Sequence, residues 1–184
     1  GSCYRKHMYS DYGYPSDSKD EQSYRLLRLG TIFHKDMEKA LDWYQSIAPY
    51  KNIYIEEKIQ LEDFDVVGTF DAGEIVEKHN LKHFNLYDFK TAAAYKWTTK
   101  FGLKKNRNPT TDTNYKLQLG TYALGVLDKY NPDKINMFLI WYNKNTSQMR
   151  EQIVSNEWIK KAKIYWHEVY YLKEDLEENF EDEL

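Results

Sequence analysis

Asp88 and Lys90 stand near the end of an otherwise apolar stretch, FNLYDFKT, which covers residues 84–91. The pattern predicts a β-strand, and residues two positions apart in a strand project from the same face. Asp88 and Lys90 should therefore share a face with Phe84 and Leu86. An acid and a base on a face that begins as core indicate either a local ion pair or a pair of groups that acts on a substrate.

A second carboxylate has a similar setting, because Asp71 lies within the apolar run VVGTFDAG. If the two strands pair antiparallel, Asp71 and Asp88 lie near each other. Two close carboxylates repel and are costly to bury unless a cation joins them, and oxygen ligands suit Mg²⁺ or Mn²⁺. Lys90 beside such an ion can steady a water or the charge on a phosphoryl group. These residue types favour phosphodiester hydrolysis over most other reactions.

A basic segment, KWTTKFGLKKNR at residues 96–107, follows this strand and contains no acidic residue. Its candidate DNA contacts are Lys96, Trp97, Lys100, Lys104, Lys105 and Arg107. Cations suit a phosphate backbone, and aromatic rings can stack on unpaired bases. The composition alone leaves a solvated loop equally open.

Charge is unevenly distributed over the 184 residues. The chain has 26 basic and 29 acidic side chains, a formal net charge of −3. Residues 173–184 hold seven acids and one lysine, so the rest of the chain carries a net charge of +3. We expect the acidic end to be a solvated helix end or a tail. The overall negative charge therefore does not exclude a nucleic-acid partner.

Cysteine content and hydropathy exclude several classes of protein. The single cysteine, Cys3, excludes an internal disulfide framework and a four-cysteine metal site within the chain. No apolar run approaches the roughly 20 residues that a membrane-spanning helix needs, and the polar start does not resemble a signal peptide. We therefore expect no membrane association and a reducing compartment.

The elements that must position these residues are helices and strands in mixed order. Helices are expected over residues 3–12, 24–48 and 112–130, and from about residue 156 into the acidic end. Strands are expected over residues 53–61, 65–76, 83–91, 135–143 and 147–154. Short connections favour an antiparallel meander for the first three strands. We expect an α/β fold in one domain, residues 1–184, with a central mixed sheet of about five strands between helices.

Five short motifs follow one another in a fixed order. They are CYRKHMY (3–9), LGTIFHKDMEKAL (29–41), VVGTFDAGEI (66–75), LYDFKTA (86–92) and YKLQLGTYAL (115–124). Together they resemble the RecB-type branch of the PD-(D/E)XK nuclease superfamily, through G-x-x-x-H-x-x-x-E, G-x-x-D, D-x-K-T and Q-x-x-x-Y patterns. The resemblance runs from Cys3 to about Tyr122, with Tyr4 in place of the usual proline.

This resemblance implies a restriction-endonuclease-like core and a metal-dependent nuclease site. His34, Asp71 and Asp88 would bind Mg²⁺ or Mn²⁺, and the carbonyl of Phe89 would add an oxygen ligand. Lys90 would position or activate the attacking water. The ion identity is left open between the two metals.

Four further residues carry weaker expectations. Gln118 and Tyr122, one helical turn apart, would line the site and contact DNA by the same resemblance, although position alone describes a surface pair. Glu38 either orients His34 or is a plain surface acid. Glu57, on the apolar side of its strand, serves a second metal or pairs with a basic side chain.

The function favoured by these residues is a metal-dependent deoxyribonuclease, with exonuclease as the preferred form. Its substrate would be single-stranded DNA or DNA with a free end, and its products would carry 5′-phosphates. The setting would be repair, recombination or phage replication in a bacterial cytoplasm. Because Cys3 stands alone, we expect none of the iron–sulfur clusters that several members of the branch hold. The alternatives are a non-catalytic DNA-binding module of the same fold, a structure-specific endonuclease and, more weakly, a nuclease acting on RNA.

Overall fold

The computed structural model describes residues 13–15, 18–49 and 51–181. Within these residues it has four α-helices and five strands. The helices are α2 (Glu21–Ile47), α3 (Ala94–Phe101), α4 (Thr113–Tyr130) and α5 (Glu157–Glu181). The strands are β1 (Asn52–Leu61), β2 (Val66–Lys78), β3 (Leu81–Ala92), β4 (Lys134–Asn143) and β5 (Met149–Val154). The helix expected over residues 3–12 lies outside the described residues.

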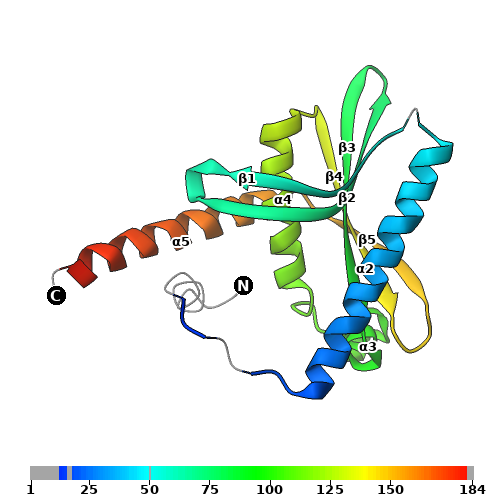
Figure 1. Ribbon diagram of the computed structural model, residues 1–184, viewed down its shortest axis with the longest axis horizontal. Helices are drawn as coiled ribbons and strands as arrows, with labels where there is room; N and C mark the ends of the chain where they lie inside the picture. Colours follow the sequence, from blue (N-terminus) through cyan, green and yellow to red (C-terminus); the bar gives the residue numbers. More distant parts are fainter. Residues whose placement is uncertain (1–12, 16–17, 50, 182–184) are drawn as a thin grey trace.

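The five strands form one mixed sheet in the order β1-β2-β3-β4-β5. The pairs β1–β2, β2–β3 and β4–β5 are antiparallel, which confirms the expected meander, whereas β3 and β4 are parallel. A parallel pair needs a long crossover, and α3 and α4 lie in that connection. The expected α/β class and the mixed five-stranded sheet are confirmed (Figure 1).

Helices cover both faces of the sheet. Phe33 of α2 stacks on Tyr142 of β4 and meets the ring of Phe89 on β3 edge to face. Tyr115 of α4 meets the ring of Trp141 edge to face. Because Trp141 and Tyr142 are neighbours on one strand, they point to opposite faces, and α2 and α4 therefore pack on opposite sides of the sheet.

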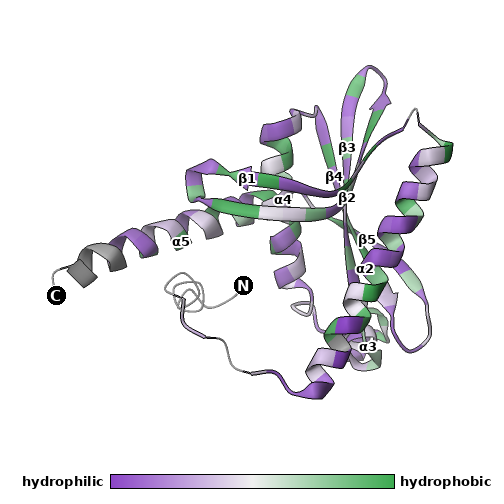
Figure 2. Ribbon diagram, viewed as in Figure 1, coloured by the Kyte–Doolittle hydropathy of each residue, from purple (hydrophilic) through white to green (hydrophobic). Residues whose placement is uncertain are grey.

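The core lies mainly between the sheet and α4. Alternation along β3 and β4 buries Phe84, Leu86, Met137, Leu139 and Trp141. Residues of α4 complete this layer: Leu119, Ala123 and Val126. α5 packs across α4 and then extends away from the sheet, where it is hydrophilic over much of its length (Figure 2).

A glycine permits the close crossing of α4 and α5. A Cβ atom on Gly120 would lie 2.3 Å from the carbonyl oxygen of Trp158, which is backbone and cannot move aside. The two helices therefore approach more closely than a larger residue at this position would allow.

The basic segment is more ordered than a loop. α3 ends at Phe101, and a short 3-10 turn covers Lys104–Asn106. Trp97 and Phe101 are four residues apart, so they share one face of α3, and their rings contact each other at 4.7 Å. This helix is not among those expected from the sequence, although the four-residue spacing of Trp97 and Phe101 is compatible with one.

The sheet divides into a fork beside Asp71 and Asp88. Pairing of β2 with β3 ends at Ala72 and Tyr87. β2 nevertheless continues along β1, and β3 continues along β4 as far as Ala92. The β1–β2 hairpin thus leaves the plane of the other strands (Figure 1). Asp71 and Asp88 lie beside the point where the two pairs of strands separate.

Candidate active site

Asp71 and Asp88 lie where the fork begins, each next to the last paired residue of its strand. Asp71 is 8% exposed and Asp88 is 1% exposed. The backbone N–H of Phe89 donates a hydrogen bond of 2.5 Å to Asp71 Oδ2, which ties the first carboxylate to the strand of the second. The structure thus brings together the two acids that the sequence analysis paired.

His34 approaches Asp71 from α2. Its Nδ1 lies 3.4 Å from Asp71 Oδ1, and its ring meets the ring of Phe89 edge to face. The hydrogen bond to Asp71 raises the pKa of His34 above its usual value. A metal ion and a proton compete for an imidazole nitrogen, so metal binding by His34 should strengthen as pH rises.

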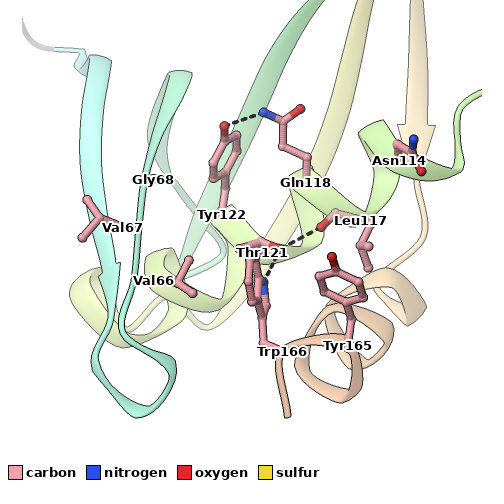
Figure 3. Close-up of a pocket in the computed structure, with 10 residues that line it drawn as sticks. All are labelled: Val66, Val67, Gly68, Asn114, Leu117, Gln118, Thr121, Tyr122, Tyr165 and Trp166. Atoms are coloured by element: carbon pink, nitrogen blue, oxygen red, sulfur yellow. Dashed lines mark hydrogen bonds between the residues drawn. The ribbon is translucent and has the colours of Figure 1, made fainter. Parts of the chain in front are cut away.

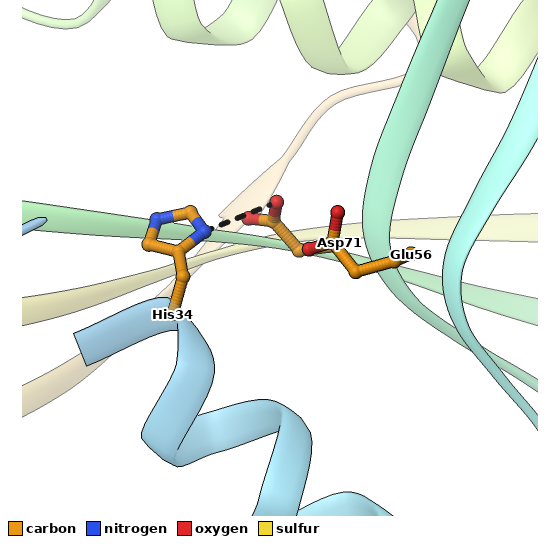
Figure 4. Close-up of side chains that lie close together, drawn as sticks. All are labelled: His34, Glu56 and Asp71. Atoms are coloured by element: carbon orange, nitrogen blue, oxygen red, sulfur yellow. Dashed lines mark ion pairs between the residues drawn. The ribbon is translucent and has the colours of Figure 1, made fainter. Parts of the chain in front are cut away.

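Glu56 completes a cluster that the sequence analysis did not identify. One nitrogen of His34 and one oxygen each of Glu56 and Asp71 lie within 4.8 Å of one another. Figure 4 shows the helix and the two strands that present these side chains toward a common point. Desolvation, followed by the charges of Asp71 and Glu38, raises the pKa of Glu56.

The polar–apolar alternation of this strand points to the neighbouring acid, Glu57, instead. Glu57 forms an ion pair with Lys129 and accepts a hydrogen bond of 3.1 Å from the hydroxyl of Tyr130. Of the two roles considered for Glu57, the structure shows the pair with a basic side chain. Alternation of polar and apolar residues cannot find Glu56, because that position is expected to be polar in any half-buried strand.

Asp88 is held by Lys90. Lys90 Nζ lies 2.9 Å from Asp88 Oδ1 and 2.7 Å from Oδ2, but only the contact with Oδ1 has hydrogen-bond geometry. Burial raises the pKa of Asp88 to about 7, although the charge of Lys90 opposes the rise, and the charge of Asp71 adds to it. This carboxylate is therefore only partly compensated by the protein.

Gln118 and Tyr122 lie together on α4, and the amide of Gln118 donates a hydrogen bond of 2.6 Å to the Tyr122 hydroxyl. A Cβ atom on Gly68 would lie 2.9 Å from the Tyr122 ring, so the glycine lets that ring pack against β2. Burial, then the charge of Asp88, raises the pKa of Tyr122 to about 12. Tyr122 is thus neutral at pH 7 and within electrostatic reach of the acids.

A pocket of roughly 370 Å³ adjoins these two residues. It lies between β2, α4 and α5, and Figure 3 shows its lining residues: Val66, Val67, Gly68, Asn114, Leu117, Gln118, Thr121, Tyr122, Tyr165 and Trp166. The indole N–H of Trp166 donates a hydrogen bond of 2.9 Å to Thr121 Oγ1, which fixes one wall. A largely apolar pocket with aromatic walls suits a base or a sugar beside the acids.

Residues of the basic segment have different surroundings. Trp97 is 8% exposed and packs against Phe101 in the core, so its ring has no open face for a base. Lys100 forms an ion pair with the buried Asp112. Lys96 Nζ donates a hydrogen bond to the Tyr115 hydroxyl and lies 4.1 Å from the centre of the Tyr115 ring. Lys90 lies 5.2 Å from the same ring, so Lys96 is the lysine of this segment that borders the site.

The remaining three basic residues of the segment are exposed. Lys104, Lys105 and Arg107 lie in and after the 3-10 turn that follows α3. Arg107 Nε donates a hydrogen bond of 2.8 Å to the carbonyl of Gly102. These charges remain available to a phosphate backbone.

The donor set fits a hard divalent cation. An imidazole and carboxylates are ligands that Mn²⁺ accepts, and Mg²⁺ prefers the carboxylate oxygens. Of the ligands predicted from the sequence, His34 and Asp71 belong to the cluster with Glu56. Asp88 lies beside this cluster and is paired with Lys90. Phe89 contacts Asp71 through its backbone N–H. Glu38 contributes charge near Glu56.

Comparison with known proteins gives a similarity of fold. No family model matches the chain, and no curated protein matches its sequence. A structure described as "putative exonuclease" from Eubacterium rectale matches with a TM-score of 0.56 and 17% identity, over 92% of this chain and 71% of the other. The structure of SSO0001 matches with a TM-score of 0.41 and 16% identity, over 89% and 71%. At such identities the first match supports the fold, and the second supports no further conclusion.

Among the residues described, no helix combines the length and the apolar character that crossing a bilayer requires.

Proposed function

We propose that this protein is a metal-dependent deoxyribonuclease of the RecB type, acting as an exonuclease on DNA with a free end. The observation that carries the proposal is the convergence of His34, Asp71 and Asp88 with Lys90 at the fork of the sheet. A buried acid with a raised pKa, beside a second buried acid and a lysine, is typical of catalytic sites. The fold similarity to a protein described as a putative exonuclease is consistent with this proposal.

Each residue has a role that follows from its position. His34, Asp71 and Asp88, with the Phe89 carbonyl, would hold Mg²⁺ or Mn²⁺. When bound, the ion supplies Lewis acidity to the phosphate and lowers the pKa of a water. Lys90, held by Asp88, faces the same region and would orient the water or stabilise charge on the phosphoryl oxygens. In-line attack of water on phosphorus, with cleavage of the P–O3′ bond, would leave a 5′-phosphate on one fragment and a 3′-hydroxyl on the other.

The substrate strand would follow the basic and aromatic residues beside the fork. Gln118 and Tyr122 would contact the nucleotide next to the scissile phosphate, with the pocket beside them for its base or sugar. Lys96 would contact a neighbouring phosphate, and Lys104, Lys105 and Arg107 would guide the strand by charge. Trp97 and Lys100, which the sequence analysis included as DNA contacts, instead pack α3 in place.

A nuclease assay with end-labelled linear DNA and Mg²⁺ or Mn²⁺ tests the proposal. We expect the wild-type protein to release nucleotides, and Lys90→Ala and Asp88→Asn to lose this activity while still binding DNA. Asp63→Asn, an exposed carboxylate in the turn after β1, is the matched control and should cut as the wild type does. DNA binding by all four proteins without cutting by any would show a non-catalytic module instead.

Two further substrates separate the remaining alternatives. Circular single-stranded DNA offers no end, so an exonuclease leaves it intact and a structure-specific endonuclease opens it. A matched RNA strand should be cut more slowly, because no described residue is placed by this proposal to recognise a 2′-hydroxyl. Faster cutting of RNA would reverse the assignment of substrate.

A further inference from the structure

We infer that Glu56 is a further ligand of the divalent cation, which it would bind together with His34 and Asp71 beside Asp88. This inference rests on the proposed function, because it concerns the same ion-dependent site. It adds a residue that neither the motifs nor the comparisons assign.

Distances within the cluster suit one small ion. Ligand atoms about 2.1 Å from a cation stand about 3–4.2 Å from each other in an octahedron. The chosen atoms of His34, Glu56 and Asp71 lie within 4.8 Å of one another, so small side-chain rotations bring them to that spacing. Asp71 offers its Oδ1 to this cluster, whereas its Oδ2 accepts from the N–H of Phe89 on β3. The two oxygens of Asp71 therefore face different neighbours.

The backbone places Glu56 opposite Asp71. Ile55 pairs with Ala72 and Glu57 pairs with Phe70, so the position between them on β1 faces Asp71. Glu56 has a φ of 48°, in the left-handed region that a non-glycine residue inside a strand rarely adopts. Such conformations persist where the surrounding structure requires them, and they gather at ligand sites.

The net negative charge at the fork favours the binding of a divalent cation. Glu56, Asp71 and Asp88 contribute three carboxylates when ionised, and in the described part of the chain Lys90 is the lysine that forms an ion pair with one of them. With His34 neutral the cluster has a net charge of −2, which one Mg²⁺ or Mn²⁺ balances. In the part of the chain that the structure describes, Glu56 forms no ion pair with a lysine or arginine, whereas Glu57 pairs with Lys129.

Glu56 and Glu57 thus provide a matched pair for a test. Titration calorimetry with Mn²⁺ alone, on the full chain, should show that Glu56→Gln weakens Mn²⁺ binding about 10–100-fold, an effect comparable to that of disturbing other metal-site groups. Glu57→Gln should bind Mn²⁺ as the wild type does. Mn²⁺ affinity of Glu56→Gln within about twofold of wild type would overturn the assignment.

A second variant keeps the inference testable if Glu56→Gln folds poorly. Glu56→Gly suits a positive φ, so it should unfold at a temperature at least as high as the wild type without metal, and yet lose the stabilisation that Mn²⁺ gives the wild type. Equal Mn²⁺ stabilisation of both proteins would overturn the assignment.

Wild-type behaviour separates this inference from the proposed function. If the wild type binds Mn²⁺ and cuts DNA, and Glu56→Gln binds Mn²⁺ equally well, then Glu56 is not a ligand but the proposed function stands. A wild type that neither binds Mn²⁺ nor cuts DNA overturns both.

Discussion

Asp88 and Asp112 are two buried aspartates whose pKa values are shifted in opposite directions. Each is 1% exposed, and burial is the largest influence on the pKa of each. Asp112 is paired with Lys100 and Lys116, and Gln152 Nε2 donates a hydrogen bond of 2.7 Å to it. These contacts lower the pKa of Asp112 below its usual value despite burial.

Asp88 has fewer partners. Among the described residues Lys90 is its paired cation, and the charge of Asp71 opposes its ionisation. Its pKa accordingly rises to about 7. Asp112, neutralised by two lysines and hydrogen-bonded by Gln152, connects α3, α4 and β5, although its Oδ1, like Oδ2 of Asp88, has no hydrogen-bond partner among the described residues. A buried carboxylate that is left partly satisfied is suited to bind a further cation.

The largest expected difference between the two aspartates is in catalysis. Asp88→Asn should reduce nuclease activity at least about a hundredfold to a thousandfold, because it removes charge at the reacting site. Asp112→Asn should retain near-wild-type activity per folded molecule. Single-turnover rates at saturating Mg²⁺, corrected for the folded fraction by circular dichroism, measure both. Equal losses in the two variants would show that Asp88 acts through stability alone.

For stability the order of the two aspartates should reverse, so that substitution of Asp112 costs more free energy of unfolding than substitution of Asp88. Asp112→Ala leaves Lys100 and Lys116 without their shared partner, and breaking a buried ion pair typically costs about 3–5 kcal/mol. The metal-free Asp88→Asn should lose less free energy of unfolding, since it removes an unfavourable charge. Urea denaturation of both variants in EDTA measures this. A smaller loss for Asp112→Ala than for Asp88→Asn would contradict the contrast.

The pH dependence of stability should reveal Asp88. Its pKa in the folded protein is about 7, above the unfolded value of roughly 4, so the folded state holds its proton more tightly. This stabilisation is complete at low pH and is lost as pH rises from about 4 to about 7, by on the order of 4 kcal/mol. The difference in unfolding free energy between wild type and Asp88→Asn, measured by urea denaturation without metal, separates the contribution of Asp88 from those of His34 and other groups. A constant difference across this pH range would refute it.

The smallest expected effect concerns Tyr122. Tyr122→Phe keeps the ring that packs against Gly68 and loses the hydrogen bond from Gln118. A net loss of about 1 kcal/mol in unfolding free energy is expected. Because the hydroxyl would contact substrate, KM for DNA should rise more than kcat falls. A loss in kcat as large as that of Lys90→Ala would instead make Tyr122 part of the chemical step.

The sequence predicted the sheet better than it predicted the fork. Alternation along residues 53–61 and 83–91 requires strands, and the short connections require antiparallel neighbours. Loss of pairing beyond Ala72 and Tyr87 is a property of three strands together, and periodicity carries no information about it. The fork is nevertheless what allows His34 from one face and Tyr122 from the other to approach the acids.

Local composition was also insufficient to separate structural from functional charges. Lys96 and Lys100 belong to the same basic run, yet one borders the site and the other is paired with Asp112. The decisive difference is the partner, which lies 12 or more residues away in the sequence. Glu56 and Glu57 show the same limit, because adjacent acids on a strand differ only in what faces them.

Anomalous X-ray scattering from a crystal soaked in Mn²⁺ tests the central claim most directly. The account predicts a manganese peak at the fork, within coordination distance of Asp71 and His34, and no peak beside Asp112, where lysines already occupy the carboxylate. A fork without a peak at saturating Mn²⁺, or a peak beside Asp112 instead, would contradict the claim that the acids at the fork form the cation site.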